Sequence, residues 1–124
     1  MDARKLKVLI VEDEFFIALD AEDQVRSLGH TVVGTAVSAE QAIQLAGREK
    51  PDVVLMDIRL VGPADGITAA LEIRSRYGVE AIFVTANTDP STLARAQSIG
   101  PVGVLQKPLT KERLAAHLAL LAAK

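Results

Sequence analysis

The chain alternates between short, continuous apolar runs and longer segments in which apolar residues recur at helical spacing. Short runs rich in Val and Ile are typical of strands that a parallel sheet buries on both faces. They predict five strands, at Leu6–Val11, Thr31–Ala36, Val53–Met56, Ala81–Thr85 and Val102–Leu105.

The segments that follow these runs have the features of amphipathic helices. The first is followed by Gly29, which favours a helix end, and carries one apolar face. That face consists of Ile17, Ala21, Val25 and Leu28. The other helices are delimited by capping residues and prolines. These are Ser38 with Gln41 before the second helix and Pro51 after it, Asp65 before the third, Asp89-Pro90 before the fourth and Thr110 before the fifth.

Strands and helices that alternate in this way form a parallel sheet with helices on both faces. With five strands the common doubly wound order is 2-1-3-4-5, the flavodoxin-like arrangement. The 124 residues, 49% hydrophobic and 24% charged, have the composition of one globular domain. We therefore predict a single α/β domain over residues 1–124, with a five-stranded sheet and five helices.

Composition and charge exclude several classes of function. The chain has no cysteine, which excludes disulfides, thiolate metal sites and a cysteine nucleophile. A formal net charge of −2 leaves no basic excess for binding nucleic acid. No apolar run reaches the ~18 residues of a membrane span, and the run Val8–Val11 is too short for a signal peptide. We expect a soluble, cytoplasmic protein that binds neither nucleic acid nor membrane.

Acidic residues follow two strands that the predicted order places side by side. Glu12 and Asp13 follow the first strand, and Asp57 follows the third. Ligands of doubly wound sheets bind outside the carboxyl ends of the strands where the winding reverses, here between these two strands. Three carboxylates in one crevice repel one another unless a cation is present. Because all the donors are oxygen atoms, the crevice favours Mg²⁺.

The fourth and fifth strands end at the same edge and bring Thr85, a hydroxyl donor, and Lys107, an ammonium group. Each residue alone has an ordinary structural explanation, since an acid after a strand often caps a helix and a loop lysine is usually solvated. Together they provide metal ligands, a hydrogen-bond donor and a cation at one place. That set stabilises a transferring phosphoryl group, so the combination predicts a phosphoryl-transfer site.

Four motifs, LIVEDE, LMDIRL, FVTAN and LQKPL, resemble those of the receiver domains of bacterial two-component response regulators, with matching spacing along nearly the whole chain. The resemblance implies that Asp57 accepts a phosphoryl group from the phosphohistidine of a sensor histidine kinase or phosphotransfer protein. It also implies that Asp13 binds Mg²⁺ directly, that Glu12 binds it mainly through water, and that the backbone carbonyl of Arg59 is a further ligand.

The same resemblance implies roles for residues at the ends of the fourth and fifth strands. Thr85 matches the hydroxyl residue that moves onto the phosphoryl group, and Lys107 matches its ion-pair partner. Ala86 matches a small residue that leaves room for the phosphate. The bond between Lys107 and Pro108 matches one that is cis in the family.

Three further positions are expected to affect how long a phosphorylated state lasts and how phosphorylation changes the rest of the domain. Arg59 and Asn87 match positions that tune its lifetime in the family. Val104 stands where receivers commonly have Tyr or Phe, whose ring moves inward as the hydroxyl residue shifts. We therefore predict that this aromatic form of coupling is absent. We also hypothesise that the Arg59 side chain reaches the three acids when Mg²⁺ is missing.

The implied function is a switch that catalyses only its own phosphorylation and dephosphorylation. Phosphorylation is expected to change a surface for a downstream protein partner, formed by the helix after Asp89, the strand Val102–Leu105 and the helix after Thr110. Because the sequence stops after that helix, we expect no output domain. The prediction is a stand-alone receiver that acts through protein contacts or as a phosphate relay or sink.

Alternatives stay open at this point. A pseudo-receiver that binds a partner without phosphorylation is one, because of Val104. A phosphohydrolase of the haloacid dehalogenase type is disfavoured, because Arg59 stands where that class carries a second Asp. The last helix has a second apolar stripe, which is either a wide margin of its core face or a surface for a homodimer or partner. That stripe consists of Ala116, Leu120 and Ala123.

Overall fold

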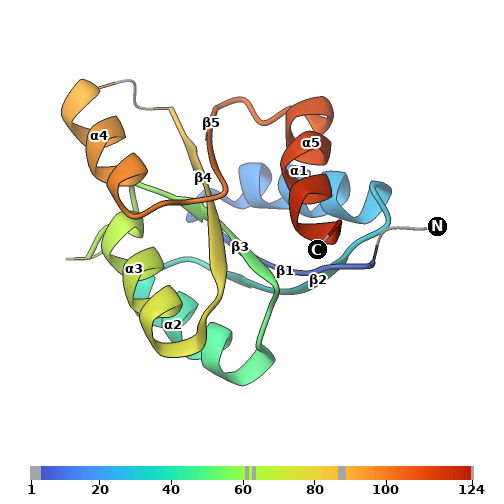
Figure 1. Ribbon diagram of the computed structural model, residues 1–124, viewed down its shortest axis with the longest axis horizontal. Coiled ribbons are helices and arrows are strands. Elements are labelled where there is room, and N and C mark those ends of the chain that lie inside the picture. The colour runs from blue at the N-terminus through green and yellow to red at the C-terminus, as the bar shows by residue number, and fades with distance from the viewer. Residues whose placement is uncertain (1–3, 61, 63, 87–88, 124) are drawn as a thin grey trace.

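The computed structural model describes residues 4–60, 62, 64–86 and 89–123, and this part of the chain contains five strands and five helices in alternation (Figure 1). The strands are β1 (Lys7–Val11), β2 (Thr31–Ala36), β3 (Val53–Asp57), β4 (Glu80–Thr85) and β5 (Gly103–Gln106). The helices are α1 (Phe15–Ser27), α2 (Ala39–Glu49), α3 (Gly66–Tyr77), α4 (Pro90–Ser98) and α5 (Lys111–Ala122). Every predicted strand is present, with its ends displaced by at most one residue.

The strands form one parallel sheet in the order β2-β1-β3-β4-β5, which confirms the predicted flavodoxin-like topology. The direction of winding reverses at β1, because the chain crosses from β2 on one side of it to β3 on the other. In the register between β1 and β3, Val11 lies opposite Met56. The residues directly after this pair therefore emerge together at the carboxyl edge of the sheet.

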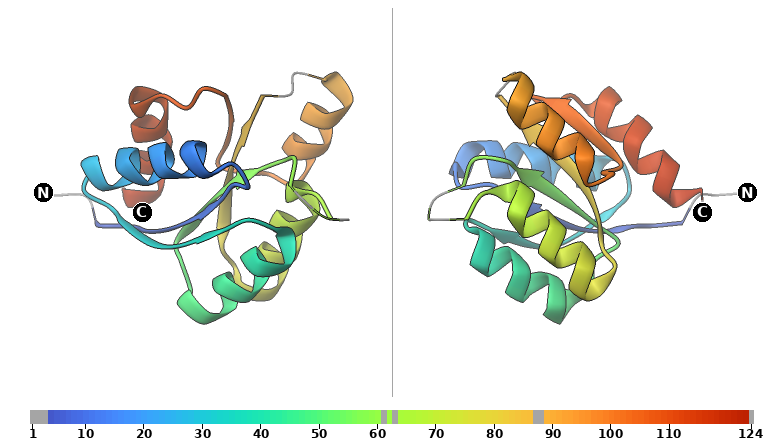
Figure 2. Two further views of the ribbon diagram at one scale, coloured as in Figure 1. Left: turned by 180° about the vertical axis from the view of Figure 1, so that it is seen from behind. Right: turned by 60° about the vertical axis from the view of Figure 1, so that its left-hand side comes forward.

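Two helical layers cover the sheet, with α1 and α5 on one face and α2, α3 and α4 on the other (Figure 2). Successive residues of β1 alternate between the two cores. Val8 and Ile10 pack beneath α1 and α5, whereas Leu9 and Val11 pack beneath the other helices. Because both faces are covered, the strands are apolar throughout, which is the origin of the continuous apolar runs in the sequence.

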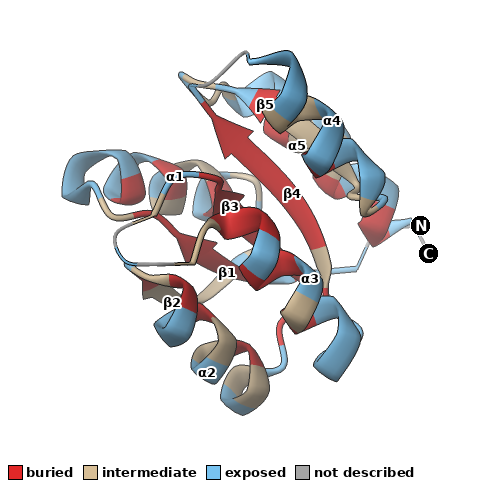
Figure 3. Ribbon diagram, turned by 90° about the vertical axis from the view of Figure 1, so that its left-hand side faces the viewer, coloured by how far each residue is buried: buried red, intermediate tan, exposed pale blue. Residues whose placement is uncertain are grey.

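Burial follows these layers: β3 is buried along its whole length, and the outer faces of the helices are exposed (Figure 3). The expected core face of α1 is partly wrong. Ile17 is 37% exposed, and the buried residues of the helix are Ala18, Ala21 and Val25. The buried face of α1 is therefore rotated toward Ala18, and Ile17 lies at its margin.

The predicted helix starts of α2 to α5 are present. Ser38 accepts a hydrogen bond from the backbone N–H of Gln41, as a capping box requires. The Gln41 side chain instead accepts from the N–H of Val37, one residue before the expected partner. The remaining caps are Asp65, Asp89 and Thr110. None of the helices in the described ranges has the length and apolarity that a membrane crossing requires.

His30 connects the turn before β2 to the chain entering β1, at the amino edge of the sheet. Its Nδ1 accepts a hydrogen bond from the backbone N–H of the buried Leu6 at 3.0 Å. An imidazole nitrogen can accept only when it carries no proton. Burial, together with the nearby charge of Lys5, lowers the pKa of His30. The folded state therefore favours the neutral ring.

We predict that protonation of His30 destabilises the fold as the pH falls from about 7.5 to about 5.5. Because the pKa is lowered in the folded state, the unfolded chain, whose histidine titrates near pH 6.5, binds the proton first, and falling pH favours unfolding. His30→Asn, whose amide oxygen can accept the same hydrogen bond, should lose this part of the pH dependence in denaturant unfolding. His30→Ala should cost about 1–3 kcal/mol by leaving the Leu6 N–H without its acceptor.

The control is His117→Asn, which changes the other histidine of the chain and should keep the pH dependence of the wild type. An unchanged pH dependence in His30→Asn would show that the hydrogen bond to Leu6 is not the source of the effect.

Candidate functional site

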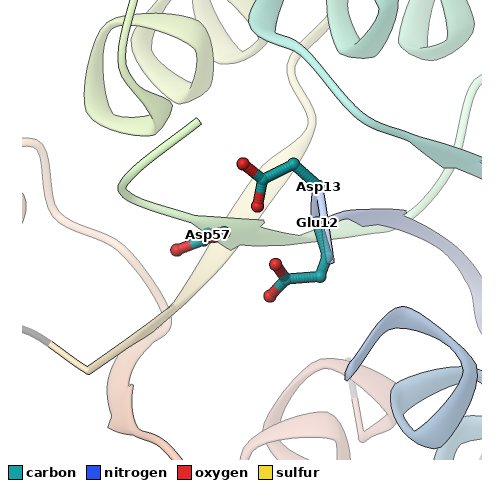
Figure 4. Close-up of side chains that lie close together, drawn as sticks. All are labelled: Glu12, Asp13 and Asp57. Atoms are coloured by element: carbon teal, nitrogen blue, oxygen red, sulfur yellow. The ribbon is translucent and has the colours of Figure 1, made fainter. Parts of the chain in front are cut away.

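Three carboxylates lie together at the carboxyl edge of the sheet, where β1 and β3 adjoin (Figure 4). Glu12 and Asp13 directly follow β1, and Asp57 is the last residue of β3. One oxygen atom from each carboxylate lies within 4.8 Å of the other two. The reversal of winding therefore gathers the acids as the strand order predicted.

Lys107 provides the positive charge closest to these acids. Glu12 and Asp57 are only 5% and 6% exposed, and buried carboxylates of this kind are costly without a partner. The Nζ of Lys107 lies 2.7 Å from Oε1 of Glu12 and 3.5 Å from Oδ2 of Asp57. One ammonium group thus pairs with both buried acids, while Asp13 is less deeply buried.

Backbone N–H groups fix the orientation of the two buried carboxylates. The N–H of Glu14 donates to Oε2 of Glu12 at 3.1 Å. The N–H of Arg59 donates to Oδ1 of Asp57 at 3.2 Å, whereas Lys107 contacts Oδ2. Each oxygen of Asp57 therefore has a different neighbour, and the carboxylate is held at a defined angle to the end of β3.

The site carries more negative than positive charge, and the pKa values of its groups reflect this. Burial, together with the charge of Glu12, raises the pKa of Asp57 to about 6. Burial and contacts with Glu12 also raise the pKa of Asp13. Burial disfavours the charged form of Lys107, but its hydrogen bond to Glu12 and the charge of Asp57 raise its pKa on balance. A further cation at this site would relieve the repulsion among the acids.

The donor set fits a hard divalent cation such as Mg²⁺. All the ligand atoms of the acidic cluster are carboxylate oxygens, and Mg²⁺ prefers oxygen ligands in sites that keep several waters. The excess of carboxylates over the single ammonium group of Lys107 favours the binding of a positive ion. The family resemblance implies one more ligand, the backbone carbonyl of Arg59. Arg59 follows Asp57 by two residues. Glu12, Asp13 and Asp57 therefore could hold a metal ion.

A polar cleft of about 490 Å³ opens beside the acids, and Thr85 and Ala86 line it together with Lys107. Thr85 ends β4 and is 2% exposed. Its carbonyl accepts a hydrogen bond from the N–H of Lys107 at 2.9 Å, which ties the end of β4 to the loop that carries the lysine. Ala86 has only a methyl group and so leaves the cleft open. The structure thus brings both strand ends to the acids.

The hypothesis that the Arg59 side chain reaches the acids when Mg²⁺ is missing stays a prediction. Within the described part of the chain, the ion pairs of the cluster are made by Lys107 and not by Arg59. The Lys107 ammonium pairs with both Glu12 and Asp57. The main chain of Arg59, through its N–H, is what contacts Asp57.

Three other predicted positions have different outcomes. The bond between Lys107 and Pro108 is cis, as predicted. Val104 lies in β5 opposite Phe83 of β4 and packs, partly buried, against the core beneath α2, α3 and α4. Its predicted effect on signalling stays a prediction. Asn87 lies outside the residues that the structure describes.

An apolar cavity next to the acids was not predicted. It has a volume of about 490 Å³, lies between α1 and the loop after β5, and has Phe16, Ile17 and Leu109 among its lining residues. Phe15 and Phe16 are 71% and 79% exposed, and their rings are in edge contact with centroids 5.3 Å apart. The sequence did contain a signal for this cavity, namely two consecutive Phe residues shortly after Glu12 and Asp13. Consecutive residues of a helix point in different directions, so one narrow face cannot bury both rings.

The sequence analysis also did not identify Gly66, which determines how closely α3 approaches the backbone of Asp57. It is the first residue of α3, and its N–H donates to the carbonyl of Ile58 at 2.7 Å. A Cβ atom on Gly66 would overlap the carbonyl oxygen of Asp57, so only glycine permits this approach. The start of α3 is therefore packed directly against the backbone of Asp57. The Asp-Gly sequence at the predicted helix start was the available signal.

Comparison with known proteins shows similarity to response regulators along most of the chain. A family model described as the response regulator receiver domain matches residues 8–119. The transcriptional regulatory protein PdtaR of Mycobacterium tuberculosis is 36% identical over 104 residues, which cover 84% of this chain and 50% of PdtaR. The phyllosphere-induced regulator PhyR of Methylorubrum extorquens is 32% identical over 114 residues, 91% of this chain and 42% of PhyR. The chain thus spans about half the length of the curated relatives it matches.

Solved structures resemble this one over nearly its whole length. The signal receiver domain of a modulated diguanylate cyclase from Desulfovibrio desulfuricans G20 has a TM-score of 0.91 and 32% identity, covering 97% of this chain and 95% of that one. The REC domain of the PhyR response regulator from Erythrobacter litoralis has a TM-score of 0.82 and 36% identity, covering 94% and 89%. Both are structures of a single receiver domain.

We predict that the acidic cluster binds Mg²⁺ and that Asp13→Asn lowers the affinity by about tenfold or more, since even indirect partners of a metal contribute 10–100-fold. Affinity should also fall as the pH drops below about 6, because protons then compete with the metal for Asp57. Calorimetric titration of the protein with Mg²⁺ measures both effects. Asp23→Asn, an exposed carboxylate on α1, serves as the control and should bind as the wild type does. Equal affinity of Asp13→Asn and the wild type would contradict the site.

Proposed function

This chain belongs to the response regulator receiver domain family, and on that premise we propose that it is a signalling switch in which Asp57 accepts a phosphoryl group. A receiver domain is a signalling module rather than an enzyme with an external substrate, and it implies a kinase and a downstream partner. We propose a sensor histidine kinase or phosphotransfer protein as the donor. Because such a donor presents its phosphohistidine in the cytoplasm, the proposal also assigns the protein to that compartment.

The observation that carries the proposal is the environment of Asp57. It is a buried carboxylate with an ammonium group 3.5 Å away, two further acids within metal-binding distance and an open polar cleft at its side. A carboxylate that only capped a helix would need none of these neighbours. A nucleophile that must approach a highly charged phosphoryl group needs all of them.

The proposed reaction begins with in-line attack of an Asp57 oxygen on the phosphorus of the phosphohistidine. The O–P bond forms as the P–N bond breaks, and the imidazole leaves with the electron pair. Lys107, already beside Oδ2, can move onto a phosphoryl oxygen, and the N–H of Arg59 holds Oδ1. A bound Mg²⁺ would supply additional neutralisation of phosphoryl charge. Water later hydrolyses the acyl phosphate in the same cleft, which resets the switch.

Thr85 and Lys107 are proposed to report the modification. A phosphoryl group on Asp57 offers acceptor oxygens that the carboxylate lacks, so contacts of the Thr85 hydroxyl and of Lys107 with those added oxygens exist only in that state. Contacts available in only one state are what shifts a two-state equilibrium. Since Thr85 ends β4 and Lys107 follows β5, the proposed readout is the surface of α4, β5 and α5.

That surface includes the second apolar stripe of α5. Ala116, Leu120 and Ala123 are all exposed, Leu120 at 60%, which supports the second of the two interpretations of this stripe. We propose it as a contact surface for a downstream partner or for a second copy of the chain. A role as a phosphate relay or sink would use the same site. It differs from a role as a switch in the fate of the phosphoryl group, which is passed to another protein or lost to water.

We predict that the wild type, incubated with acetyl phosphate and Mg²⁺, gains a phosphate-sized increase in intact mass. Asp57→Asn should gain none, because it lacks the nucleophilic carboxylate. Lys107→Ala should be phosphorylated at least about tenfold more slowly, in the range that a lost charge-stabilising contact costs. Asp23→Asn is the matched control for a change of one carboxylate.

Absence of an adduct on the wild type would support the pseudo-receiver alternative, and an adduct that persists in Asp57→Asn would show that another residue is modified.

We propose that the donor protein binds at the exposed Phe15–Phe16 pair. A donor histidine has to reach Asp57 through the cleft, so the protein around it must cover the neighbouring rim. That rim includes Phe16 and the apolar cavity beside Leu109. Large apolar side chains at the centre of an interface often dominate its binding energy.

We predict that Phe16→Ala lowers the rate of phosphotransfer from a kinase active on the wild type by about tenfold, the effect of losing one strong interface contact. The rate with acetyl phosphate should not change, because that small donor makes no contact with the helix. Leu71→Ala, which truncates an exposed residue of α3, is the control. Equal loss with both donors would mean that Phe16 acts on the site and not on docking.

A further inference from the structure

Helix α4 buries fewer side chains than any other helix in the described part of the chain. Its only fully buried side chain in the described range is Ala96, whose methyl group covers little apolar surface. Leu93 and Ile99 are partly buried. Because hydrophobic stabilisation scales with the apolar area removed from water, the position of α4 depends strongly on its polar contacts.

Those polar contacts join α4 to α3 at two points. In the last turn of α4, Nη2 of Arg95 lies 3.1 Å from Oδ2 of Asp65, the N-cap residue of α3. Directly after this turn, Arg74 of α3 donates to the carbonyls of Ile99 and Gly100, where α4 terminates. The two helices lie on the same face of the sheet (Figure 2).

Asp65 uses its two carboxylate oxygens for different purposes. Oδ1 accepts a hydrogen bond from the N–H of Thr68 at 2.9 Å and caps α3, while Oδ2 pairs with Arg95. The next residue, Gly66, is the one packed against the carbonyl of Asp57. A contiguous set of contacts therefore runs from the backbone of Asp57 through Gly66 and Asp65 to Arg95 on α4.

We propose that Asp65 and Arg95 form a latch that holds α4 against the start of α3 and sets how readily α4 moves when Asp57 is modified. The inference rests on the proposed function for its signalling role, but the latch itself is a property of the unmodified protein. Arg74 contacts the backbone just after α4, whereas the latch is the contact that ties a side chain of α4 itself to the start of α3, beside the site. With Val104 in β5, the latch couples the site to α4 without an aromatic ring at that position.

Arg95→Gln tests the latch without touching the acidic cluster. Amide hydrogen exchange of Thr92–Ile99 should become about 1.5- to 5-fold faster, the factor that corresponds to an exposed ion pair. High salt should accelerate exchange in the wild type and have less effect in the variant, because screening removes the same interaction. Asp65→Asn, which keeps the cap on Thr68, should resemble Arg95→Gln, and the double variant should be no faster than either one.

Arg76→Gln is the matched control. Arg76 pairs with Glu72 within α3, and the side chains of this pair are 56% and 39% exposed, against 55% and 35% for Arg95 and Asp65. The control loses an equally exposed ion pair that does not join two helices, so exchange in α4 should stay at the wild-type rate. Equal exchange in the wild type, Arg95→Gln and Arg76→Gln would overturn the latch.

The signalling role has a separate measurement. If the latch opposes movement of α4, Arg95→Gln should be phosphorylated by acetyl phosphate faster than the wild type by about the same factor as its increase in exchange, because both report one equilibrium. Faster exchange without faster phosphorylation would overturn the coupling. If the wild type forms no adduct at all, the proposed function fails, while the exchange measurements still decide whether the latch exists.

Discussion

The ion pairs of Lys107 with Glu12 and Asp57 are the interaction on which the rest of the site depends. Two carboxylates that are almost fully buried end adjacent parallel strands, and the folded chain tolerates them because one ammonium group lies 2.7 Å from the first and 3.5 Å from the second. Burial, together with the charge of Glu12, raises the pKa of Asp57 to about 6, and the arrangement leaves the site with a deficit of positive charge. The same deficit makes the site suited to bind a cation and a phosphoryl group together.

The fold and the location of the site were predictable from the sequence because both follow from patterns with a clear physical origin. Strands buried on both faces must be continuously apolar, and the strand order brings the residues after Val11 and Met56 to one edge. Lys107 was expected there for the same reason. What could not be predicted is how its charge is shared between Glu12 and Asp57, since this depends on side-chain conformations.

Other errors and omissions have a similar cause. Ile17 was expected in the core, but α1 buries Ala18 instead, and the rotation of a helix about its own axis is not fixed by the spacing of apolar residues alone. The role of Gly66 depends on a distance of closest approach between α3 and the backbone of Asp57, and no periodic pattern records such a distance. Contacts between exposed side chains of different helices, such as Arg95 and Asp65, likewise require the three-dimensional arrangement.

The chain enters and leaves the fold at the same pole. The backbone N–H of Arg4, ahead of β1, donates to the carbonyl of Ala122 near the end of α5 at 3.4 Å. Figure 1 shows the two termini on the same side of the molecule. Since the strands run from this pole toward the acids and the helices run back, the acidic cleft lies at the opposite pole. Polypeptide attached at either end would therefore begin far from the cleft and leave access to it open, and the two ends are close enough to be joined by a short linker for circular permutation.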